Sequence, residues 1–500
     1  MSQPPPLRRS KPVWLRLLLV FGLIVGFVGG AVIGFNAYAA AKLRAAIADY
    51  EADGETLDFR SLLPELVPDD QNFCAIPELA NLADEELGKA NRERIEAMAL
   101  PEPNAIRGPR PSLPNGATTG KSTDLTLWAK WLTGNEPHNE ASAAEAVERA
   151  LSKDPELVEA LIAAVDRPAA AWTPAWKTQE LPEILYGIQV PHLKSAQDLI
   201  PVVSLLVQVA ERTQDTEHAV ELTLAQLRLA EAAYGDPMLV GTLVGTTCLT
   251  EAFDSIWTIF ASGLQTPETI DKLRSAIGRI DVRAAMLQAC RADLATGCQA
   301  IRYVKSRNEL FKTMSDLSYP EGESNKELSF ISRKLWSMFT PGICDLNSVN
   351  LIGLEYRHLI HPIRDSGIAA ASEGSVLEEE LTRRKGIWRL DSIFVKLALP
   401  MVMKAAKKIA VSEAYFDLAI TACRLEAHFA EHGSYPETLG DLPPDMSYDR
   451  TASRYRLWLP GPDGEDDGGK RILDPEKPEK TKFHADDYQG DWVWDYPVES

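Results

Sequence analysis

The 500-residue sequence predicts a mainly α-helical protein with one N-terminal transmembrane helix, an α-hairpin array and a small α+β module at the C-terminus. Three observations lead to this fold class. An uncharged apolar stretch lies near the start, helix start and stop signals recur through the middle, and two short alternating segments lie near the end. The chain is too long for one core of typical size, and its 45% hydrophobic residues are enough to build buried cores.

The apolar stretch 17–38 contains no charged residue. As a helix it would measure about 33 Å, enough to cross a hydrocarbon core of about 30 Å. The residues before it are basic and include no acid: Arg8, Arg9, Lys11 and Arg16. The positive-inside rule therefore predicts a cytoplasmic tail 1–16, a transmembrane helix 17–38 and an exported body. We expect a bacterial inner-membrane protein, anchored in the lipid bilayer, with its body in the periplasm.

A cleaved signal peptide is the alternative interpretation of the same stretch. The sequence Ala37-Tyr38-Ala39 has the small-x-small form of a cleavage site, and a basic segment precedes it. However, the apolar run is longer than the roughly 7–15 residues of a signal-peptide core, and helix-compatible sequence continues beyond it. We therefore favour a retained anchor, and both interpretations predict export.

A glycine stripe follows one face of the predicted span. It consists of Gly22, Gly26, Gly30 and Gly34, which form three overlapping G-x-x-x-G units. Glycines at this spacing make a shallow groove where a second helix can approach closely, which predicts self-association. The alternative is that glycine is simply frequent in membrane spans.

Behind the span we expect a juxtamembrane helix and an irregular linker over residues 39–123, then a helical domain over 124–400. Asp154-Pro155 and Thr266-Pro267 place an N-cap before a proline at the first helical position. Asp215 caps another helix, and Gly263 ends the helix that starts near residue 238. Loops of two to six residues between long helices favour antiparallel neighbours, so the array should consist of α-hairpins.

Charge and cysteine content exclude several function classes. The net charge of −20 repels phosphate backbones, so nucleic-acid binding is not expected. The six cysteines show no C-x-x-C spacing, which argues against zinc ribbons and thioredoxin-type redox pairs. Disulfides in an oxidising compartment and buried free thiols both remain open. The sequence also lacks a P-loop and a G-x-S-x-G motif.

Two histidine motifs could bind a metal. His428, Glu431 and His432 match H-x-x-E-H, in which two histidines on one helical face bind zinc and the glutamate acts as general base. This zinc peptidase motif also needs a third ligand in a downstream helix, and the 68 residues that follow are rich in Gly, Pro and Asp. His358 and His361, with Glu355 one turn earlier, form the second set. Pro362 directly follows it, so we interpret this set as a surface helix end.

The last ninety residues contain a recognisable succession of elements. An amphipathic helix ends at Gly433, Tyr435-Pro436 begins a short second helix, and the alternating segment "SRYRLWLP" predicts a strand. The acidic stretch "GPDGEDDGG" follows, and "GDWVWDYP" predicts a second strand. This order resembles the globular end of type II secretion major pseudopilins, and also a segment of large membrane-anchored proteins of planctomycetes and verrucomicrobia. "PDDQNFCAIPEL" at 68–79 resembles the second group as well.

The resemblance implies a pseudopilin-like α+β module over residues 401–500 with a calcium-binding loop. The residues at the matching positions are Asp463, Glu465, Asp466 and Asp467. Calcium accepts six to eight oxygens in flexible geometry, and carboxylates are costly to crowd without a cation. A solvated acidic turn is the alternative interpretation.

The chain departs from pseudopilins in its organisation, because several hundred residues separate the span from the module and no prepilin processing site opens the span. Assembly into a pilus is therefore not expected. The sequence favours a structural or interaction role as an envelope scaffold, with a calcium-stabilised module. The alternative is an extracytoplasmic zinc-dependent hydrolase that uses His428, Glu431 and His432.

Overall fold

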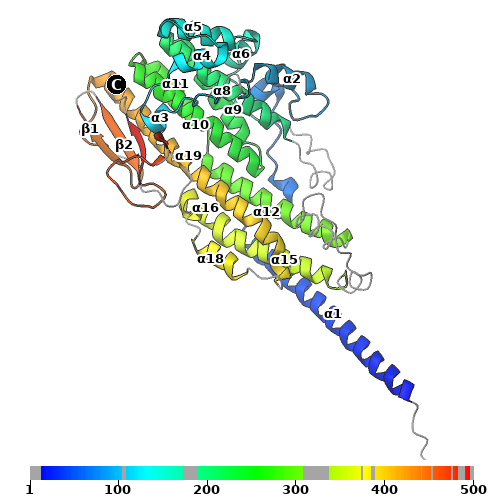
Figure 1. Cartoon of the computed structure of the whole chain (residues 1–500). Helices are drawn as coiled ribbons and strands as arrows, with labels where there is room; N and C mark the ends of the chain where they lie inside the picture. The colour runs from blue at the N-terminus through cyan, green and yellow to red at the C-terminus, as the bar shows by residue number, and fades with distance from the viewer. Residues whose placement is uncertain are drawn as a thin grey trace, which may run out of the picture. The chain divides into compact units, whose positions relative to one another are not determined.

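A computed structural model describes residues 13–103, 108–172, 190–307, 337–372, 375–384, 389–440, 442–451, 454–474, 477–481 and 490–495. The fold is mainly helical, with a small antiparallel sheet near the C-terminus (Figure 1). The chain divides into two compact units. Unit 1 comprises residues 1–57, 294–357 and 376–399, and unit 2 comprises 58–293, 358–375 and 400–500. The basic tail falls on residues 1–12, which lie outside the described ones, and on the start of the first helix.

The first helix, α1 (Val13–Ala52), is continuous through the predicted span and the juxtamembrane segment. Its apolar side chains are exposed from Leu17 to Ile33, with Val32 as an exception, whereas Ala39 and Tyr50 are buried. The stretch Leu17–Ala52 is long and apolar enough to cross a membrane. A second helix, α8 (Pro191–Arg212), is also long and apolar enough to cross a membrane. However, 72% of its most apolar stretch is buried inside the protein, as expected for a core helix.

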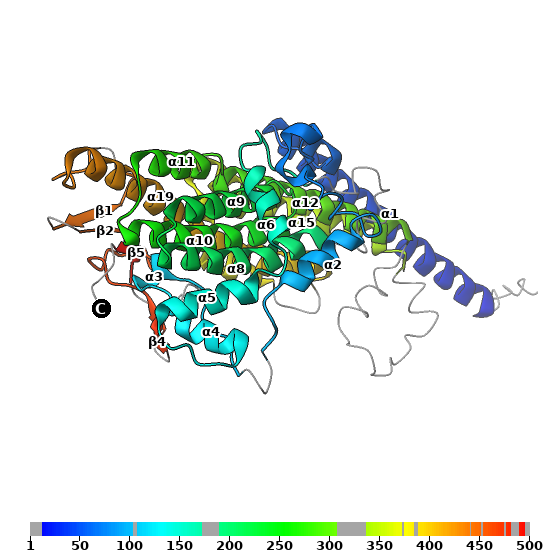
Figure 2. The same cartoon turned by 90° about the horizontal axis from the view of Figure 1, so that it is seen from above.

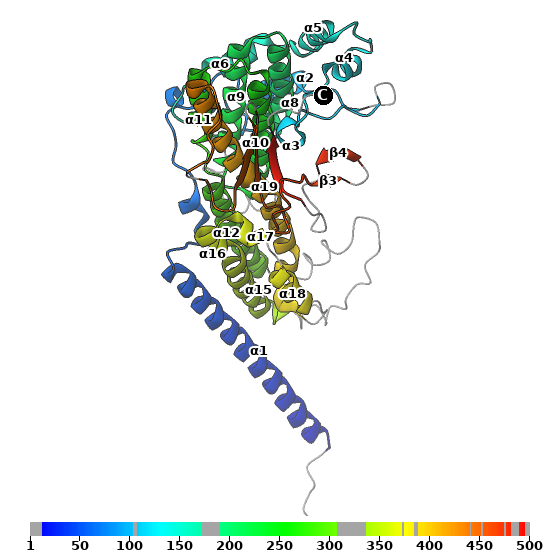
Figure 3. The ribbon, with the colours of Figure 1, turned by 90° about the vertical axis from the view of Figure 1, so that its left-hand side faces the viewer.

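In unit 1, the second half of α1 packs against α15 (Thr340–Glu355). Figures 1 and 3 show the first half of α1 extending beyond α15. A pair of aromatic rings lies at each end of the contact between α1 and α15. Phe35 lies 5.9 Å from Phe339, and Tyr50 meets Tyr356 edge to face at 5.5 Å, measured between ring centroids. The unit also contains the later part of α12 (Val282–Arg307), most of α18 (Ser375–Arg383), η6 (Leu390–Ser392) and the start of α19 (Ile393–His432).

In unit 2, three long helices contact one another: α8, α9 (Thr216–Tyr234) and α10 (Leu239–Ser262). Figure 2 shows them side by side, with α5 (Glu140–Leu151) next to α8 and α11 (Pro267–Ile277) next to α9. Short connections join successive neighbours, as the sequence predicts. Unit 2 also contains the first part of α12 and most of α19. Its other helices are α2 (Lys89–Met98), α3 (Gly116–Thr119), α4 (Leu125–Thr133), α6 (Pro155–Ala163), α16 (His361–Ser366) and α17 (Ile368–Ser372). Short helical turns are η1 (Phe59–Leu62), η2 (Asp69–Gln71), η3 (Phe73–Ala75) and η5 (Tyr356–Ile360), the last shared with unit 1.

Most predicted helix ends are confirmed. The Asp154 side chain accepts a hydrogen bond from the Leu157 N–H at the start of α6, and Asp215 accepts one from the His218 N–H at the start of α9. Gly263 ends α10 with a φ of 68°, in the left-handed region that favours glycine. The segment predicted as an irregular linker also contains α2 and α3, which the sequence analysis did not predict.

The C-terminal sheet has the order β1-β2-β5 and is antiparallel throughout. Its strands are β1 (Ser447–Arg450), β2 (Tyr455–Leu459) and β5 (Trp492–Asp495). A separate pair joins β3 (Leu473–Asp474) to β4 (Lys477–Thr481). The two predicted strands are confirmed as β2 and β5, and they pair with each other. The strand β1 was not predicted, because its four residues carry little alternation.

The prediction of a short helix starting at Tyr435-Pro436 is wrong, because residues 433–440 form bends and irregular backbone. Tertiary contacts keep this segment in a non-helical conformation. The Tyr435 ring stacks on Phe429 at 4.6 Å and meets Tyr455 at 4.9 Å between centroids. The Pro436 carbonyl accepts a hydrogen bond from the Tyr448 hydroxyl at 3.0 Å. These long-range contacts override the local helix-start signal.

Candidate functional site

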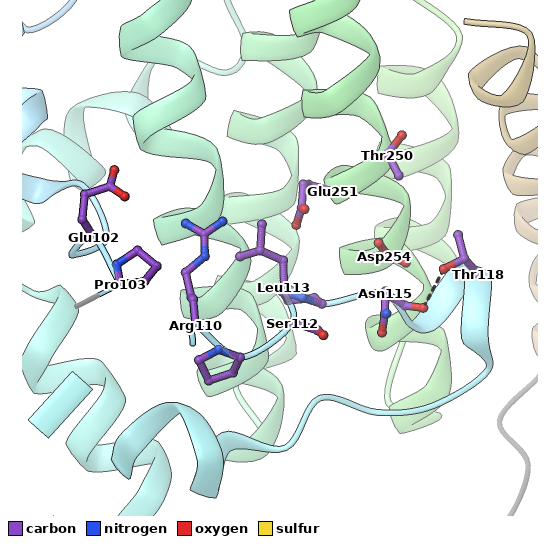
Figure 4. Close-up of a pocket in the computed structure, with 12 residues that line it drawn as sticks. Glu102, Pro103, Arg110, Ser112, Leu113, Asn115, Thr118, Thr250, Glu251 and Asp254 are labelled. Atoms are coloured by element: carbon purple, nitrogen blue, oxygen red, sulfur yellow. Dashed lines mark hydrogen bonds between the residues drawn. The ribbon is translucent and has the colours of Figure 1, made fainter. Parts of the chain in front are cut away.

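A cavity of about 700 Å³ opens beside α10 in unit 2. Figure 4 shows its two sides, with Arg110 and Leu113 on the 108–115 loop and Glu251 and Asp254 on α10. This volume lies within the range of about 300–1,000 Å³ that is typical of small-molecule sites. The lining residues are Glu102, Pro103, Arg110, Pro111, Ser112, Leu113, Pro114, Asn115, Thr118, Thr250, Glu251 and Asp254.

Close packing fixes the loop side of the cavity. A Cβ atom on Gly116 would lie 2.2 Å from the Trp257 ring, so only glycine lets α3 approach α10 this closely. The Trp257 indole N–H donates to the Asp495 carbonyl of β5 at 2.6 Å, and the Arg471 Nε donates to the Thr118 carbonyl at 3.0 Å. Helix α10, the loop and the C-terminal sheet therefore meet around one buried tryptophan.

Two buried carboxyl groups face the cavity from α10. Glu251 is 9% exposed and Asp254 is 2% exposed. They are three residues apart on a helix, which places them on neighbouring positions of one face. The Ser204 hydroxyl donates to Glu251 Oε2 at 3.0 Å, and the Ala117 N–H donates to Asp254 Oδ1 at 2.8 Å. Each carboxyl group is thus oriented through one of its two oxygens.

Burial changes the acidity of both groups. It raises the pKa of Glu251 to about 7, although the Ser204 hydrogen bond and the charge of Arg110 act in the opposite direction. Burial and the neighbouring charge of Glu251 raise the pKa of Asp254 well above its ordinary value. Perturbed carboxyl groups in a cavity are typical of functional sites, since structural carboxylates are usually placed where their charge is favourable.

A second layer of side chains supports Glu251. The Gln226 amide donates to Ser204 Oγ at 2.8 Å, and that hydroxyl donates to Glu251. Both Gln226 and Ser204 are fully buried. A chain of buried hydrogen bonds from α9 through α8 to α10 therefore fixes the rotamer of Glu251.

Glu251 and Asp254 were not among the predicted site residues, although the sequence of α10 contains a signal for them. They are the only charged residues in the 24 residues of α10. Acids are rarely fully buried without a partner, so an i, i+3 acid pair in an otherwise uncharged helix indicates a polar site within the core.

The predicted calcium residues lie in the turn between β2 and β3. Asp463 and Glu465 are exposed, and the Glu465 N–H donates to Asp463 Oδ1 at 3.2 Å. The Asp466 carboxylate accepts hydrogen bonds from the Trp458 indole and the Gly468 N–H, both at 2.9 Å, and these contacts lower its pKa. Within the described residues, no three side chains of His, Cys, Asp or Glu are gathered as a metal-binding group.

A buried acid outside the predicted set fixes this turn. Asp491, directly before β5, accepts hydrogen bonds from the N–H groups of Asp467 at 3.2 Å and Gly469 at 2.7 Å. Asp491 is 1% exposed, and burial, followed by the charges of Asp466 and Asp467, raises its pKa. The turn is therefore ordered by its own hydrogen bonds, and calcium binding to it remains a prediction.

The H-x-x-E-H residues lie at the exposed end of α19. His428 Nδ1 is hydrogen-bonded to the Ser434 carbonyl at 2.8 Å, and His432 Nδ1 to the His428 carbonyl at 3.2 Å. The two rings stack with centroids 4.2 Å apart and planes 19° apart. A zinc ion lies near the plane of each imidazole that binds it, and two nearly parallel planes share no nearby point. Zinc binding would therefore require one ring to rotate.

The second histidine set lies at the π-helical turn η5 and at the start of α16. Glu355 is fully buried, whereas His361 is exposed and pairs with Asp365 at 3.3 Å. The six cysteines are all buried free thiols. Burial raises the pKa of Cys298 and Cys344 to about 12, so these thiols are protonated at neutral pH and inert as nucleophiles.

No family model, no curated protein and no solved structure matches this chain. Its function must therefore be inferred from its own residues.

Proposed function

We propose that this chain is a single-pass protein of the bacterial inner membrane whose periplasmic body acts as a structural or interaction platform in the cell envelope. The observation that carries the proposal is the continuity of α1. Its first half exposes apolar side chains such as Phe21, Leu23 and Phe27, which are 65%, 72% and 79% exposed. Its second half belongs to the core of unit 1. One helix thus joins an apolar surface suited to lipid to a folded body.

The same helix supports a retained anchor over a cleaved signal peptide. The small-x-small sequence Ala37-Tyr38-Ala39 lies within α1, where Ala39 is fully buried. Cleavage there would also remove Phe35 and Asn36, which contact the start of α15.

The C-terminal sheet supports the resemblance to pseudopilins, because β2 and β5 pair and the acidic turn lies between β2 and β3. Trp492, Val493 and Trp494 of β5 are all buried. We propose that this segment is a borrowed pilin-like folding module that calcium stabilises and that does not polymerise. A buried sheet suits a structural role.

A tagged full-length chain tests the proposal. A phosphatase that is active only outside the cytoplasm, fused after Ser500, should be active, and a fluorescent protein that folds only in the cytoplasm should be dark at the same position. The chain should stay in the membrane pellet after carbonate extraction at its full mass. A soluble product that begins at Ala40, with the residues up to Ala39 removed, would overturn the anchor.

The zinc hydrolase alternative needs a separate measurement. Zinc content of the purified full-length chain is compared with that of the double variant His428→Ala, His432→Ala. We expect no stoichiometric zinc in either protein. One equivalent of zinc that disappears in the variant would favour the hydrolase over the platform.

A further inference from the structure

We propose that the cavity beside α10 binds a small organic molecule through its protonated primary amine, which Glu251 and Asp254 hold between them. This site lies in unit 2 and does not depend on the proposed platform role.

The two carboxyl groups present free acceptors to the cavity. Glu251 uses Oε2 for the Ser204 hydroxyl, and Asp254 uses Oδ1 for the Ala117 N–H. Within the described part of the chain, Glu251 Oε1 and Asp254 Oδ2 have no hydrogen-bond donor, and neither carboxylate forms an ion pair. Both groups are at least nine-tenths buried. Burial favours the protonated form of both groups while the cavity is empty, and a positively charged, hydrogen-bonding guest would stabilise their ionised form.

The chemistry of the lining favours an ammonium group over a metal ion. An ammonium carries one charge and three donors, which match Glu251 Oε1, Asp254 Oδ2 and one neutral acceptor such as the Thr250 hydroxyl. A divalent metal requires more anionic oxygen, and Glu102, the third acid of the lining, does not gather with this pair into a metal-binding group; no such group exists among the described residues. The guanidinium of Arg110 on the cavity wall also repels a double charge more strongly than a single one.

The remaining wall suits a short hydrocarbon body. Pro111, Leu113 and Pro114 of the 108–115 loop line the cavity and offer apolar contact. Arg110 is exposed, so it stands at the rim, while Glu251 and Asp254 lie at depth. A ligand that enters with its ammonium first would contact the prolines with its methylene groups and keep its other end at the rim. A carboxylate at that end would meet Arg110.

The side-chain conformations of Glu251 and Asp254 are fixed without a ligand. The buried Gln226–Ser204–Glu251 chain fixes one carboxyl group, and the α3 backbone fixes the other through Ala117. Binding then costs little side-chain entropy on the protein side.

Calorimetry on the full-length protein in detergent tests this inference with three matched probes: n-butylamine, 1-butanol and calcium chloride. We expect saturable, one-site binding of n-butylamine and at least tenfold weaker binding of 1-butanol, which has the same body without the charge. Equal binding of amine and alcohol would show a merely apolar cavity. No amine binding, together with calcium binding that is lost in the double variant Glu251→Gln, Asp254→Asn, would assign the pair to a metal. Either result overturns the proposal.

Variants locate the site. The isosteric double variant Glu251→Gln, Asp254→Asn should weaken n-butylamine binding at least tenfold. The matched control Glu156→Gln, Glu159→Gln removes an i, i+3 acid pair from the exposed face of α6 and should leave binding unchanged. Leu113→Trp keeps both acids and narrows the cavity from the loop side, so it should weaken n-butylamine binding, even if the double variant fails to fold. Unchanged binding in Leu113→Trp would overturn the proposal.

Discussion

Asn36 of α1 holds the start of α15 through both ends of its carboxamide, with Gly342 as one partner. The Gly342 N–H donates to Asn36 Oδ1 at 2.9 Å, and Asn36 Nδ2 donates to the Met338 carbonyl, also at 2.9 Å. The four N-terminal N–H groups of a helix lack partners inside it, and Asn36 satisfies one of these for α15. Asn36, near the end of the apolar stretch 17–38, thus attaches α1 to α15.

Gly342→Ala should destabilise this attachment. A Cβ atom at residue 342 would lie 2.5 Å from Phe35 Cε1 and 2.6 Å from Asn36 Oδ1, so the two helices would have to separate. We expect a loss of about 1–3 kcal/mol in the free energy of unfolding, measured with denaturant on the full-length chain. The matched control is Gly353→Ala in the same helix, where the new Cβ meets only Arg357 at 3.6 Å. That change should be neutral or stabilise by up to about 1 kcal/mol. Equal effects at both glycines would contradict the attachment.

The glycine stripe should mediate self-association of the span. Gly22, Gly26, Gly30 and Gly34 are exposed, and a Cβ atom on any of them would have no neighbour within 4 Å. The stripe is therefore open to a second copy of the chain. Gly26→Ile with Gly30→Ile should abolish a dimer signal in a membrane two-hybrid assay, because branched side chains close the groove. The control Val25→Ile with Val28→Ile adds bulk outside the stripe, so the dimer signal should be retained. Loss of signal in both would indicate a general effect on insertion.

Glu251→Gln should stabilise the protein at alkaline pH and change little in acid. The pKa of Glu251 is raised from 4.5 to about 7 in the native state, so the native state binds this proton more tightly than the unfolded state. Its contribution to the free energy of unfolding is therefore present below pH 4.5 and is lost as the pH rises to 7, by about 3 kcal/mol. Glutamine keeps the acceptor for Ser204 and cannot ionise. The difference between variant and wild type should grow from about pH 5 to pH 8 in denaturant titrations.

The exposed Glu268→Gln change on α11 serves as the control for that measurement, because it removes an acid at the protein surface. A constant difference for Glu251→Gln across the same range would mean that its carboxyl group titrates normally.

Calcium should stabilise the acidic turn if the carboxylates bind it. At a hundredfold excess over Kd, binding to the folded state alone is worth about 2.7 kcal/mol. Millimolar calcium should then raise the melting temperature of the full-length chain, and magnesium should do so much less, because it demands tight octahedral geometry. The full chain is required, since Trp257 and the β5 backbone bind each other across unit 2. The triple variant Asp463→Asn, Asp466→Asn, Asp467→Asn should lose the response.

Three exposed acids on α5 and α6 provide the matched control for the calcium response: Glu145→Gln, Glu148→Gln and Glu156→Gln. This variant should respond to calcium as the wild type does. Equal shifts from both ions, or an unchanged response in the aspartate variant, would mean screening of an acidic surface.

Features that depend on neighbours along the chain could be predicted from sequence alone. The apolar run of α1, the caps at Asp154 and Asp215 and the terminating Gly263 act within one or two turns of helix, and period and residue type reveal them. The strands β2 and β5 could also be predicted from sequence, because each is a short segment of alternating or aromatic residues.

Features that depend on residues far apart in the chain required the fold. The segment after Gly433 is not helical, because the Tyr435 ring packs on Tyr455 and Phe429. Residues 400–500 belong to the same unit as 58–293, and the 108–115 loop lies over α10. The burial of Glu251 and Asp254 and their raised pKa values arise from this packing, and the only local sign of them is two acids in an otherwise uncharged helix.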